Sequence, residues 1–320
     1  MTFAFKALWC FAAAAAVLSG TSALLAARRP VRSARSARPV APAALELQVL
    51  LDRAGFSPGE IDGSSGQNSR KALAAFRAAR GIASGPRAQQ ALLDALEVGA
   101  VEPLVTYTVS ADDVAGPFTE TMPVDMTEKS KLPGLHYASA LEALGEKFHA
   151  APALLKRLNP GARFIEGESI RVPNVAERER AMASVVRVVV SKKTSILTVY
   201  DGQDRVIFHA PVTSGSEHDS LPIGTWAVTS VVRNPTFNYN PALFWDADPA
   251  NAKATIPAGP NNPVGVVWID INKPHYGMHG TPAPGAIGHS ASHGCVRLTN
   301  WDATRLAGLV AKGTEVVFKE

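Results

Sequence analysis

Cysteine is nearly absent from this chain of 320 residues, which contains only Cys10 and Cys295. So few cysteines exclude the small secreted scaffolds that several disulfides hold together. Charged residues make up 19% of the chain and hydrophobic residues 46%, and this balance excludes a disordered protein. The length is sufficient for two or three domains that each bury a core.

The chain also lacks a good candidate for a membrane span near its start. The apolar run there, Ala7 to Leu18, is too short and too rich in alanine. Small-residue cleavage sites follow it, so residues 1–27 are predicted to be a secretory signal peptide. The protein is then expected in the periplasm or cell wall. An uncleaved anchor that keeps the chain near the membrane is one alternative. A transit peptide is another, since no acidic residue precedes Glu46, but the unbroken apolar run argues against it.

A basic binding face is missing from the rest of the chain. Six of the 32 basic residues lie within the first 38 positions, so the other 26 face all 28 acidic residues and leave a net charge near −2. This distribution excludes nucleic acid as a partner. Residues 28–44 are rich in Arg, Ser, Ala and Pro and are predicted to be a solvated linker. Attraction of their arginines to an anionic membrane or wall polymer is the alternative.

Residues 45–98 are predicted to be a small helical module. Apolar residues at helical spacing indicate helices over 45–54, from Asn68 or Ser69 to Phe76, and over 88–96, and the turn-rich GFSPGEIDGSSG separates the first two. The stretch resembles the peptidoglycan-binding repeat. The matching residues are Leu47-Gln48, Leu51, Gly55-Phe56, Pro58-Gly59, Ile61-Asp62-Gly63, Gly66, Ser69, Ala72 and Phe76. A helical spacer that has kept this fold without the ligand is the alternative.

Residues 105–175 are predicted to be an α+β module. Two short helices, over 141–148 and 153–158, precede an Asn-Pro-Gly turn and a short strand over 168–172. This order resembles the second half of a LysM carbohydrate-binding module. Residues 115–137 depart from the LysM pattern as an insertion rich in Pro, Thr and Met. The charged residues 176–184 are predicted to be a linker.

From Val185 the pattern changes to short β-branched runs separated by turn residues. The runs VVRVVV, SILTVY, VIFHAPV, TWAVTSVV, VVWIDI and EVVF predict a mainly-β domain over 185–320, a β-sandwich with mixed sheets. One helix is expected over 300–311. Residues 233–263 are expected to be a long loop, and long loops inside compact domains are usually functional or disordered. The aromatic residues Phe237, Tyr239, Phe244 and Trp245 favour a lid over a site, and Tyr276 is predicted to belong to it.

Removal of the signal peptide would also remove Cys10 and leave Cys295 without an intramolecular partner. In an oxidising compartment an odd cysteine predicts an intermolecular disulfide or a free reactive thiol. Four histidines, His275, His279, His289 and His293, lie close before Cys295. The residues around this thiol therefore decide its chemistry.

Two chemistries could use these histidines. The spacing of His289, His293 and Cys295 would suit a metal, but a closed zinc site needs four fixed ligands and no Asp or Glu occurs between positions 277 and 299, so no metal is expected. The other chemistry is a thiol nucleophile that an imidazole activates. His279 follows the strand VVWIDI and is expected to face a cleft. His275 and His289 are predicted to be hydrogen-bonded turn residues.

The residues next to Cys295 suit the thiol chemistry. Gly294 permits a strained turn and lets a substrate carbonyl approach the backbone closely. Ser292 and His293 supply side-chain hydrogen bonds, and the amides near Gly294 and Cys295 offer an oxyanion hole. No cofactor is expected.

His279-Gly280, followed by the string SHGCVRL, resembles the signature of the L,D-transpeptidase (YkuD-type) catalytic domain, and the resemblance covers residues 185–320. It implies that Cys295 attacks a peptidoglycan stem tetrapeptide between its third residue and the terminal D-alanine. His279 would be the proton acceptor and donor, with the carbonyl of Gly280 orienting its ring. An amine of a neighbouring stem would then take the acyl group to give a 3→3 crosslink. Some family members carry Asn where this chain has Arg297, which either binds a carboxylate or braces the loop.

Other interpretations of the same residues stay open. An L,D-carboxypeptidase or endopeptidase would use water in place of the amine, and the amine could belong to a protein instead of a stem. Papain-like and NlpC/P60-type peptidases place the cysteine before the histidine, and sortases lack the Ser-His-Gly-Cys string. The non-enzyme alternative is a scaffold that its two N-terminal modules hold on peptidoglycan stem peptides and glycan.

Overall fold

The computed structural model describes residues 43–83, 85–176, 185–247 and 251–320. The predicted signal peptide, nearly all of the linker predicted over 28–44 and most of the linker predicted over 176–184 lie outside these residues. Pro39–Glu320 form one compact unit. In the described ranges, no helix combines the length and the apolar content needed to cross a membrane.

Residues 44–95 contain three helices, α1 (Ala44–Arg53), α2 (Gln67–Ala79) and α3 (Pro86–Ala95). Their core includes Leu50, Phe56 and Phe76, and the two phenyl rings lie edge to face at 5.3 Å. The helix start predicted at Asn68 or Ser69 is wrong, because α2 begins at Gln67, after Gly66, and no side chain caps it. The Asn68 amide donates instead to the carbonyl of Ile287 at 2.9 Å, a contact that local sequence could not indicate.

Residues 104–173 contain an antiparallel strand pair and four helices. These are β1 (Leu104–Thr108), α4 (Ala111–Val114), α5 (Met126–Ser130), α6 (Ala140–Lys147), α7 (Pro152–Leu158) and β2 (Ser169–Pro173). Leu144, Leu155 and Ile170 lie in their buried core. The helices α6 and α7 start and end within one residue of the helices expected there, and α5 lies in the segment expected to be an insertion.

Nine strands form one mixed sheet in the order β5-β4-β3-β13-β7-β10-β11-β12-β6. They are β3 (Val185–Ser191), β4 (Ile196–Asp201), β5 (Val206–Pro211), β6 (Thr213–Ser214), β7 (Gly224–Arg233), β10 (Val267–Ile271), β11 (Gly277–His279), β12 (Val296–Arg297) and β13 (Glu315–Lys319). The strand β13 comes last in the chain but lies in the middle of the sheet, parallel to β3 and antiparallel to β7. In this sheet β13 is therefore the strand that links β3 to β7.

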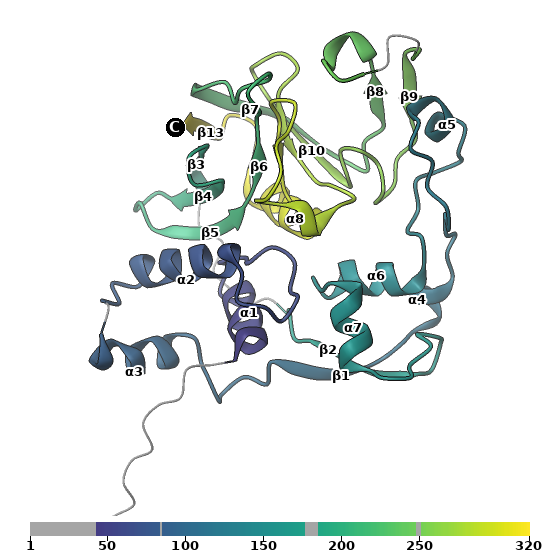
Figure 1. Cartoon of the computed structure of the whole chain (residues 1–320). Helices are drawn as coiled ribbons and strands as arrows, with labels where there is room; N and C mark the ends of the chain where they lie inside the picture. Colours follow the sequence, from purple (N-terminus) through teal and green to yellow (C-terminus); the bar gives the residue numbers. More distant parts are fainter. Residues whose placement is uncertain (1–42, 84, 177–184, 248–250) are drawn as a thin grey trace, which may run out of the picture. The chain divides into compact units, whose positions relative to one another are not determined.

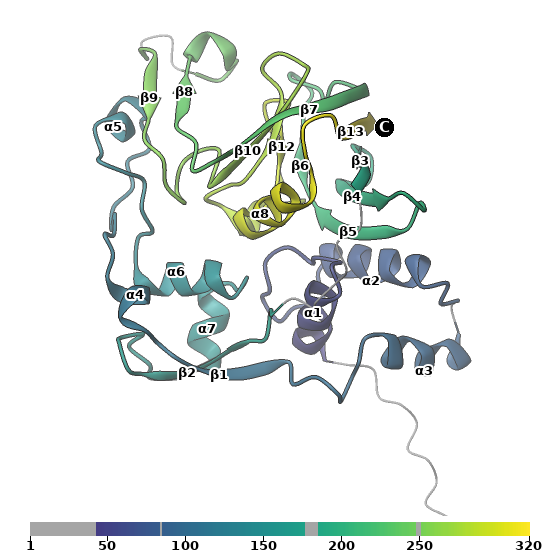
Figure 2. The same cartoon turned by 180° about the vertical axis from the view of Figure 1, so that it is seen from behind.

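The long strand β7 belongs to both halves of the sheet (Figure 2). Residues 224–227 pair with β13, and residues 228–233 pair with β10. A change of partner along one strand lets the two halves fold over a shared core, as in a sandwich. The mainly-β domain expected from the sequence is thus confirmed. Its core combines Val188, Leu197 and Phe208 from one half with Ile269, Met278 and Val296 from the other.

The helix expected near the end of this domain is α8 (Asn300–Leu309), which packs against β10 and β11 (Figure 1). The Thr299 hydroxyl caps it by accepting from the Asp302 amide at 3.1 Å. Leu306 is fully buried on the core side. The first turn of α8 therefore lies next to the strand that carries His279.

The long loop predicted over 233–263 is wrong in part, because it contains a strand hairpin. The strands β8 (Phe237–Tyr239) and β9 (Ala254–Ile256) pair antiparallel, and the 3-10 turn η1 (Pro241–Leu243) follows β8. Phe237 is half-buried, Asn238 exposed and Tyr239 buried, which is the alternation of a strand. We call the described residues 237–247 and 251–256 the β8–β9 flap.

Candidate active site

Cys295 and His279 are placed by two short neighbouring strands. The strands β11 and β12 run parallel, with Met278 opposite Val296 and His279 opposite Arg297. Met278 and Val296 are fully buried in the core. Because side chains alternate along a strand, His279, Arg297 and the preceding Cys295 project from the other face. The structure therefore brings the predicted thiol and imidazole to one side of the sheet.

The Cys295 thiol is free and half-buried. Its Sγ donates to the carbonyl oxygen of His275 at 3.6 Å. Burial raises the pKa of this thiol, while a backbone hydrogen bond from Gly277 and the charge of Arg297 act in the opposite direction. Cys295 is thus protonated at rest, and Gly277 and Arg297 are two groups that can stabilise its thiolate.

His279 is 4% exposed and its ring orientation is closely defined. Its Nδ1 lies 2.7 Å from the carbonyl oxygen of Gly280, and its ring stacks on Trp268 with the centroids 5.4 Å apart. A carbonyl can only accept, so Nδ1 carries the proton and Nε2 has a free lone pair. Burial, and then the charge of Arg297, lower the pKa of His279 to about 3. The imidazole is therefore neutral and can accept a proton at ordinary pH.

Arg297 lies in cross-strand register with His279 and is half-buried. Its charge influences both His279 and Cys295, and burial lowers its own pKa. The buried Nε of its guanidinium has no hydrogen-bond partner in the described structure. Arg297 is thus positioned to act by charge on the two groups and still has an unused donor.

Ser292 braces the turn that carries Cys295. Its hydroxyl donates to the carbonyl oxygen of Cys295 at 2.6 Å and accepts from the Gly215 amide at 2.7 Å. The Ser292 amide in turn donates to the Gly215 carbonyl at 3.1 Å. With its only proton donated to Cys295, this side chain is a support for the turn and not a free donor to a substrate.

Gly294 occupies a backbone conformation that strains any residue with a side chain. Its φ is +97°, and a Cβ added there would lie 2.6 Å from Cε1 of Tyr276. The Tyr276 ring therefore packs directly against the residue before Cys295. This places one of the predicted lid residues at the thiol.

The β8–β9 flap reaches the site through His293. The Nε2 of His293 lies 2.8 Å from Oδ1 of Asp246, and its ring contacts Phe244 edge to face at 5.0 Å. Trp245 lies 6.1 Å from the same ring and stacks on His218 at 4.3 Å. Trp245 is 58% exposed, so an apolar indole face is open to solvent beside the site.

Two of the predicted lid residues, Phe237 and Tyr239, are linked to this arrangement, within the described residues, only through Phe244. Their rings lie 6.3 and 5.5 Å from the Phe244 ring and pack with it, Leu135 and Ile256 in a small core of the flap. Tyr239 is only 6% exposed there. Alternation along β8 turns both rings towards Leu135, behind Phe244, and their part in covering the site stays a prediction.

Three contributors to the site could not be assigned from the sequence. Trp268 was visible only as one residue of a strand, although its position opposite His279 follows once the register of β10 and β11 is known. Asp246 lies 47 residues before His293 in the chain. Asn300 looked like an ordinary first residue of a helix, and its contact with Gly280 depends on the tertiary fold.

The other two histidines lie at turns. His275 has a positive φ of 69° and is exposed, and the His289 amide donates to the Ala286 carbonyl at 3.1 Å. Among the residues that the structure describes, no three His, Cys, Asp or Glu side chains gather in a way that could hold a metal ion.

Comparison with known proteins identifies the β domain. A family model described as the YkuD L,D-transpeptidase catalytic domain matches residues 185–318. Residues 185–318 are an L,D-transpeptidase catalytic domain. The chain is accordingly an enzyme of the L,D-transpeptidase class.

Several relatives share this domain. A YkuD-type protein of Bacillus licheniformis, classed by name as an L,D-transpeptidase, is 28% identical over 179 residues, which cover 55% of this chain and 91% of the relative. The Probable L,D-transpeptidase YbiS of Escherichia coli K12 is 28% identical over 182 residues, 56% of this chain and 59% of its own length. Among solved structures, L,D-transpeptidase 3 of Mycobacterium tuberculosis with a faropenem-derived adduct is 19% identical, covers 49% of this chain and 75% of that one, and gives a TM-score of 0.34.

Proposed function

We propose that this L,D-transpeptidase acts on peptidoglycan stem peptides with Cys295 as nucleophile and His279 as proton acceptor and donor. The donor would be a stem tetrapeptide, which is cleaved before its terminal D-alanine, and the acceptor an amine of a neighbouring stem, which gives a 3→3 crosslink. The observation that carries the proposal is the parallel pairing of β11 and β12. It places the free thiol and a neutral, oriented imidazole on one face of the sheet.

The first half-reaction forms a thioester. The Cys295 proton passes to Nε2 of His279, and the sulfur attacks the carbonyl carbon of the third stem residue. The C–N bond to D-alanine then breaks, and His279 returns the proton to the leaving amine. Backbone N–H groups of Gly294 and Cys295 are the proposed donors to the oxyanion, and Arg297 favours the thiolate by its charge.

The second half-reaction transfers the acyl group. The acceptor amine gives a proton to His279 and attacks the thioester carbonyl. The C–S bond breaks, and the proton returns to the Cys295 sulfur. Water in place of the amine would give hydrolysis by the same residues, so access to the acyl-enzyme decides the product. Phe244 and Trp245 of the flap, beside His293, are the groups proposed to control that access.

The N-terminal residues are proposed to hold the enzyme on its polymer in the periplasm or cell wall. Residues 45–98 would act as a peptidoglycan-binding module and residues 105–175 as a LysM-like module. A cavity of about 580 Å³ in the second module supports this, since it lies between the start of α6 and the turn after α7. Polar and aromatic groups line it, among them Ser139, Asn159, Arg163 and Phe164.

The test uses the purified protein with disaccharide tetrapeptides and identifies the products by mass spectrometry. Crosslinked dimers are expected from the wild type and not from Cys295→Ala or His279→Ala. D-alanine and tripeptide without dimers would replace the proposal with a carboxypeptidase. No turnover, together with no thiol adduct after incubation with a carbapenem, would contradict the proposal as a whole.

A further inference from the structure

The buried side chain of Asn300 joins three segments behind His279. It is 3% exposed and is the first residue of α8. Its Oδ1 accepts from the Val266 amide at 3.2 Å, and its Nδ2 donates to the carbonyl oxygen of Pro260 at 3.1 Å. The Nδ2 also donates to Oε1 of Glu146 at 3.3 Å. Both amide hydrogens and the amide oxygen are therefore in use.

Asn300 is in direct contact with the backbone of Gly280. A Cβ added to Gly280 would lie only 2.2 Å from Oδ1 of Asn300, and one added to Gly265 would lie 2.1 Å from the same oxygen. Glycine at both positions lets the amide approach closely. The carbonyl of Gly280 is the group that holds Nδ1 of His279 at 2.7 Å. The Asn300 amide thus contacts the same residue whose carbonyl orients the imidazole.

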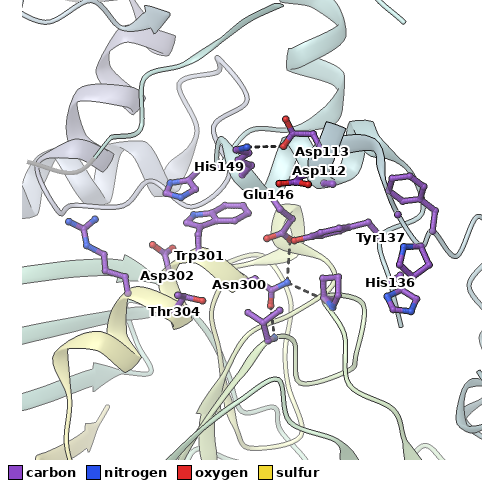
Figure 3. Close-up of a pocket in the computed structure, with 18 residues that line it drawn as sticks. Asp112, Asp113, His136, Tyr137, Glu146, His149, Asn300, Trp301, Asp302 and Thr304 are labelled. Carbon is purple, nitrogen blue, oxygen red and sulfur yellow. Dashed lines mark hydrogen bonds and ion pairs between the residues drawn. The ribbon is translucent and has the colours of Figure 1, made fainter. Parts of the chain in front are cut away.

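The third partner, Glu146, comes from α6, outside the 185–318 domain (Figure 3). It lies at a cavity of about 710 Å³ whose wall also includes Tyr137, His149 and Trp301. Burial raises the pKa of Glu146 to about 8, and the hydrogen bond from Asn300 opposes that shift. Both forms of the carboxyl group can accept from Asn300. The contact therefore persists across the range in which the group titrates.

We propose that Asn300 is a positioning residue for His279 and that Glu146 keeps the Asn300 amide in its working orientation. A residue of α6 then helps to set the geometry of the catalytic base in another part of the chain. The inference rests on the proposed role of His279. A displacement of the imidazole by about 1 Å would slow the reaction by up to about 100-fold without weakening substrate binding.

The first test compares Asn300→Ala with Asn262→Ala as a matched control. Asn262 is also fully buried, accepts from the Val264 amide at 2.9 Å and donates to the Pro257 carbonyl at 2.7 Å, so these two bonds join it to backbone groups of its own segment. Asn300→Ala is expected to lower kcat by about 10- to 100-fold with KM changed by less than about twofold. Asn262→Ala is expected to lose stability without that loss in kcat. Equal losses of kcat in the two variants would overturn the proposal.

The second test exchanges the hydrogen-bond donor and acceptor between residues 300 and 146. Asn300→Asp removes both N–H donors of residue 300, the one to Glu146 and the one to the Pro260 carbonyl, so it is expected to impair kcat. Glu146→Gln can still accept and is expected to be close to wild type. The double variant Asn300→Asp/Glu146→Gln restores the hydrogen bond between residues 300 and 146 but not the bond to Pro260, so kcat is expected to recover in part over Asn300→Asp. Glu146→Ala leaves one Asn300 N–H without its acceptor and is expected to lower kcat. Wild-type kcat in Glu146→Ala would remove Glu146 from the proposal.

The rate at which iodoacetamide alkylates Cys295, followed against pH, gives a readout that needs no peptide. It is expected to fall in Asn300→Ala and to recover in the double variant, in parallel with kcat. Unchanged alkylation in Asn300→Ala would overturn the link to the dyad. Because this readout is independent of the acyl acceptor, a wild type that makes no crosslinks would contradict the proposed function and leave this test intact.

Discussion

At the scale of single residues, Arg297 acts on both members of the proposed dyad. Its positive charge disfavours a proton on His279 and favours ionisation of Cys295. Both effects promote the combination that nucleophilic attack requires, a neutral imidazole next to a thiol that can lose its proton. The burial that raises the pKa of the thiol is thus partly offset by a residue two positions further along the chain.

Arg297→Gln removes this charge and is expected to raise the pKa of both groups. The imidazole becomes easier to protonate, and the thiol becomes harder to ionise. The pH profile of Cys295 alkylation should therefore move to higher pH. At pH 7 the rate should fall in proportion to the thiolate fraction, by about tenfold if the thiol becomes tenfold less acidic.

The control is Arg187→Gln, which changes the net charge equally. Arg187 pairs with Asp204 at 2.9 Å, and Asp204 is largely exposed. Its alkylation profile should match the wild type. A profile that stays in place for Arg297→Gln, or that moves to lower pH, would contradict the electrostatic role.

Gly294→Ala is expected to abolish the working geometry of the thiol. Its positive φ costs an alanine about 1 kcal/mol or more, and the new Cβ would also displace Tyr276. Gly313→Ala is the matched control, because φ there is +91° and nothing lies within 4 Å of the added Cβ. Urea unfolding should show a similar backbone cost in both variants, and only Gly294→Ala should lose alkylation and turnover. Normal activity in Gly294→Ala would contradict this account of the turn.

The residues at the thiol were predictable because their chemistry is local. The string around Cys295 and the spacing to His279 both lie within a short stretch of chain. Asn300 was not predictable, since its function depends on Gly280 and on a carboxyl group 154 residues away. Sequence patterns indicate which residue types are reactive, but a positioning contact is a property of the packed molecule.

At the scale of elements, the β8–β9 flap is linked to the catalytic turn by one polar pair. His293 and Asp246 form it, with side chains that are 25% and 48% exposed. A partly exposed pair contributes little to stability, about 0–1 kcal/mol. We expect the pair instead to fix the position of Phe244 and Trp245 beside the site.

Asp246→Ala should therefore raise KM for the donor by about three- to tenfold, while the free energy of unfolding changes by less than about 1 kcal/mol. Asp204→Ala breaks another exposed pair far along the chain and should alter neither KM nor kcat. Steady-state kinetics and urea unfolding of both variants measure the difference. An unchanged KM in Asp246→Ala would show that the pair does not hold the flap over the substrate.

The longer strands were predictable from their β-branched runs, because alternation over five or more residues is a distinct pattern. The strands β6, β8, β9, β11 and β12 were missed since two or three residues contain no complete period. Two of these short strands hold His279 and Arg297. The elements that build the site are therefore those with the weakest sequence signal.

At the scale of the whole molecule, residues 55–57 lie along the edge strand β5. The Ser57 amide donates to the His209 carbonyl at 2.7 Å, and the His209 amide donates to the Gly55 carbonyl at 2.9 Å. The Ser57 hydroxyl also donates to Oδ2 of the buried Asp302 at 2.8 Å. These contacts cover this edge of the sheet. An uncovered edge is a template for pairing with strands of other chains.

Ser57→Ala leaves the Asp302 carboxylate with one donor fewer and should cost about 1–3 kcal/mol in the free energy of unfolding. Burial already raises the pKa of Asp302 to about 6, and loss of the hydroxyl should raise it further. Amide hydrogen exchange at His209 should become faster. Ser110→Ala, which removes a hydroxyl that donates to Asp113 at 2.8 Å within α4, should leave that amide protected. Equal protection of the His209 amide in both variants would contradict the link between the Ser57–Asp302 hydrogen bond and the edge strand β5.

Local sequence patterns cannot predict contacts of this kind. Ser57 and Asp302 are 245 residues apart in the chain, and each belongs to a segment that local patterns describe adequately by itself. The sequence therefore predicts the separate parts of the chain and says nothing of the hydrogen bonds that join them.

The central place of β13 has a consequence for the timing of folding. During synthesis the thiol and the imidazole emerge before residues 315–319, which link β3 to β7 in the folded sheet. Domains generally fold as units, so the site is expected to assemble only after β13 has joined β3 and β7. A nascent chain would thus keep its reactive cysteine unassembled until residues 315–319 have left the ribosome.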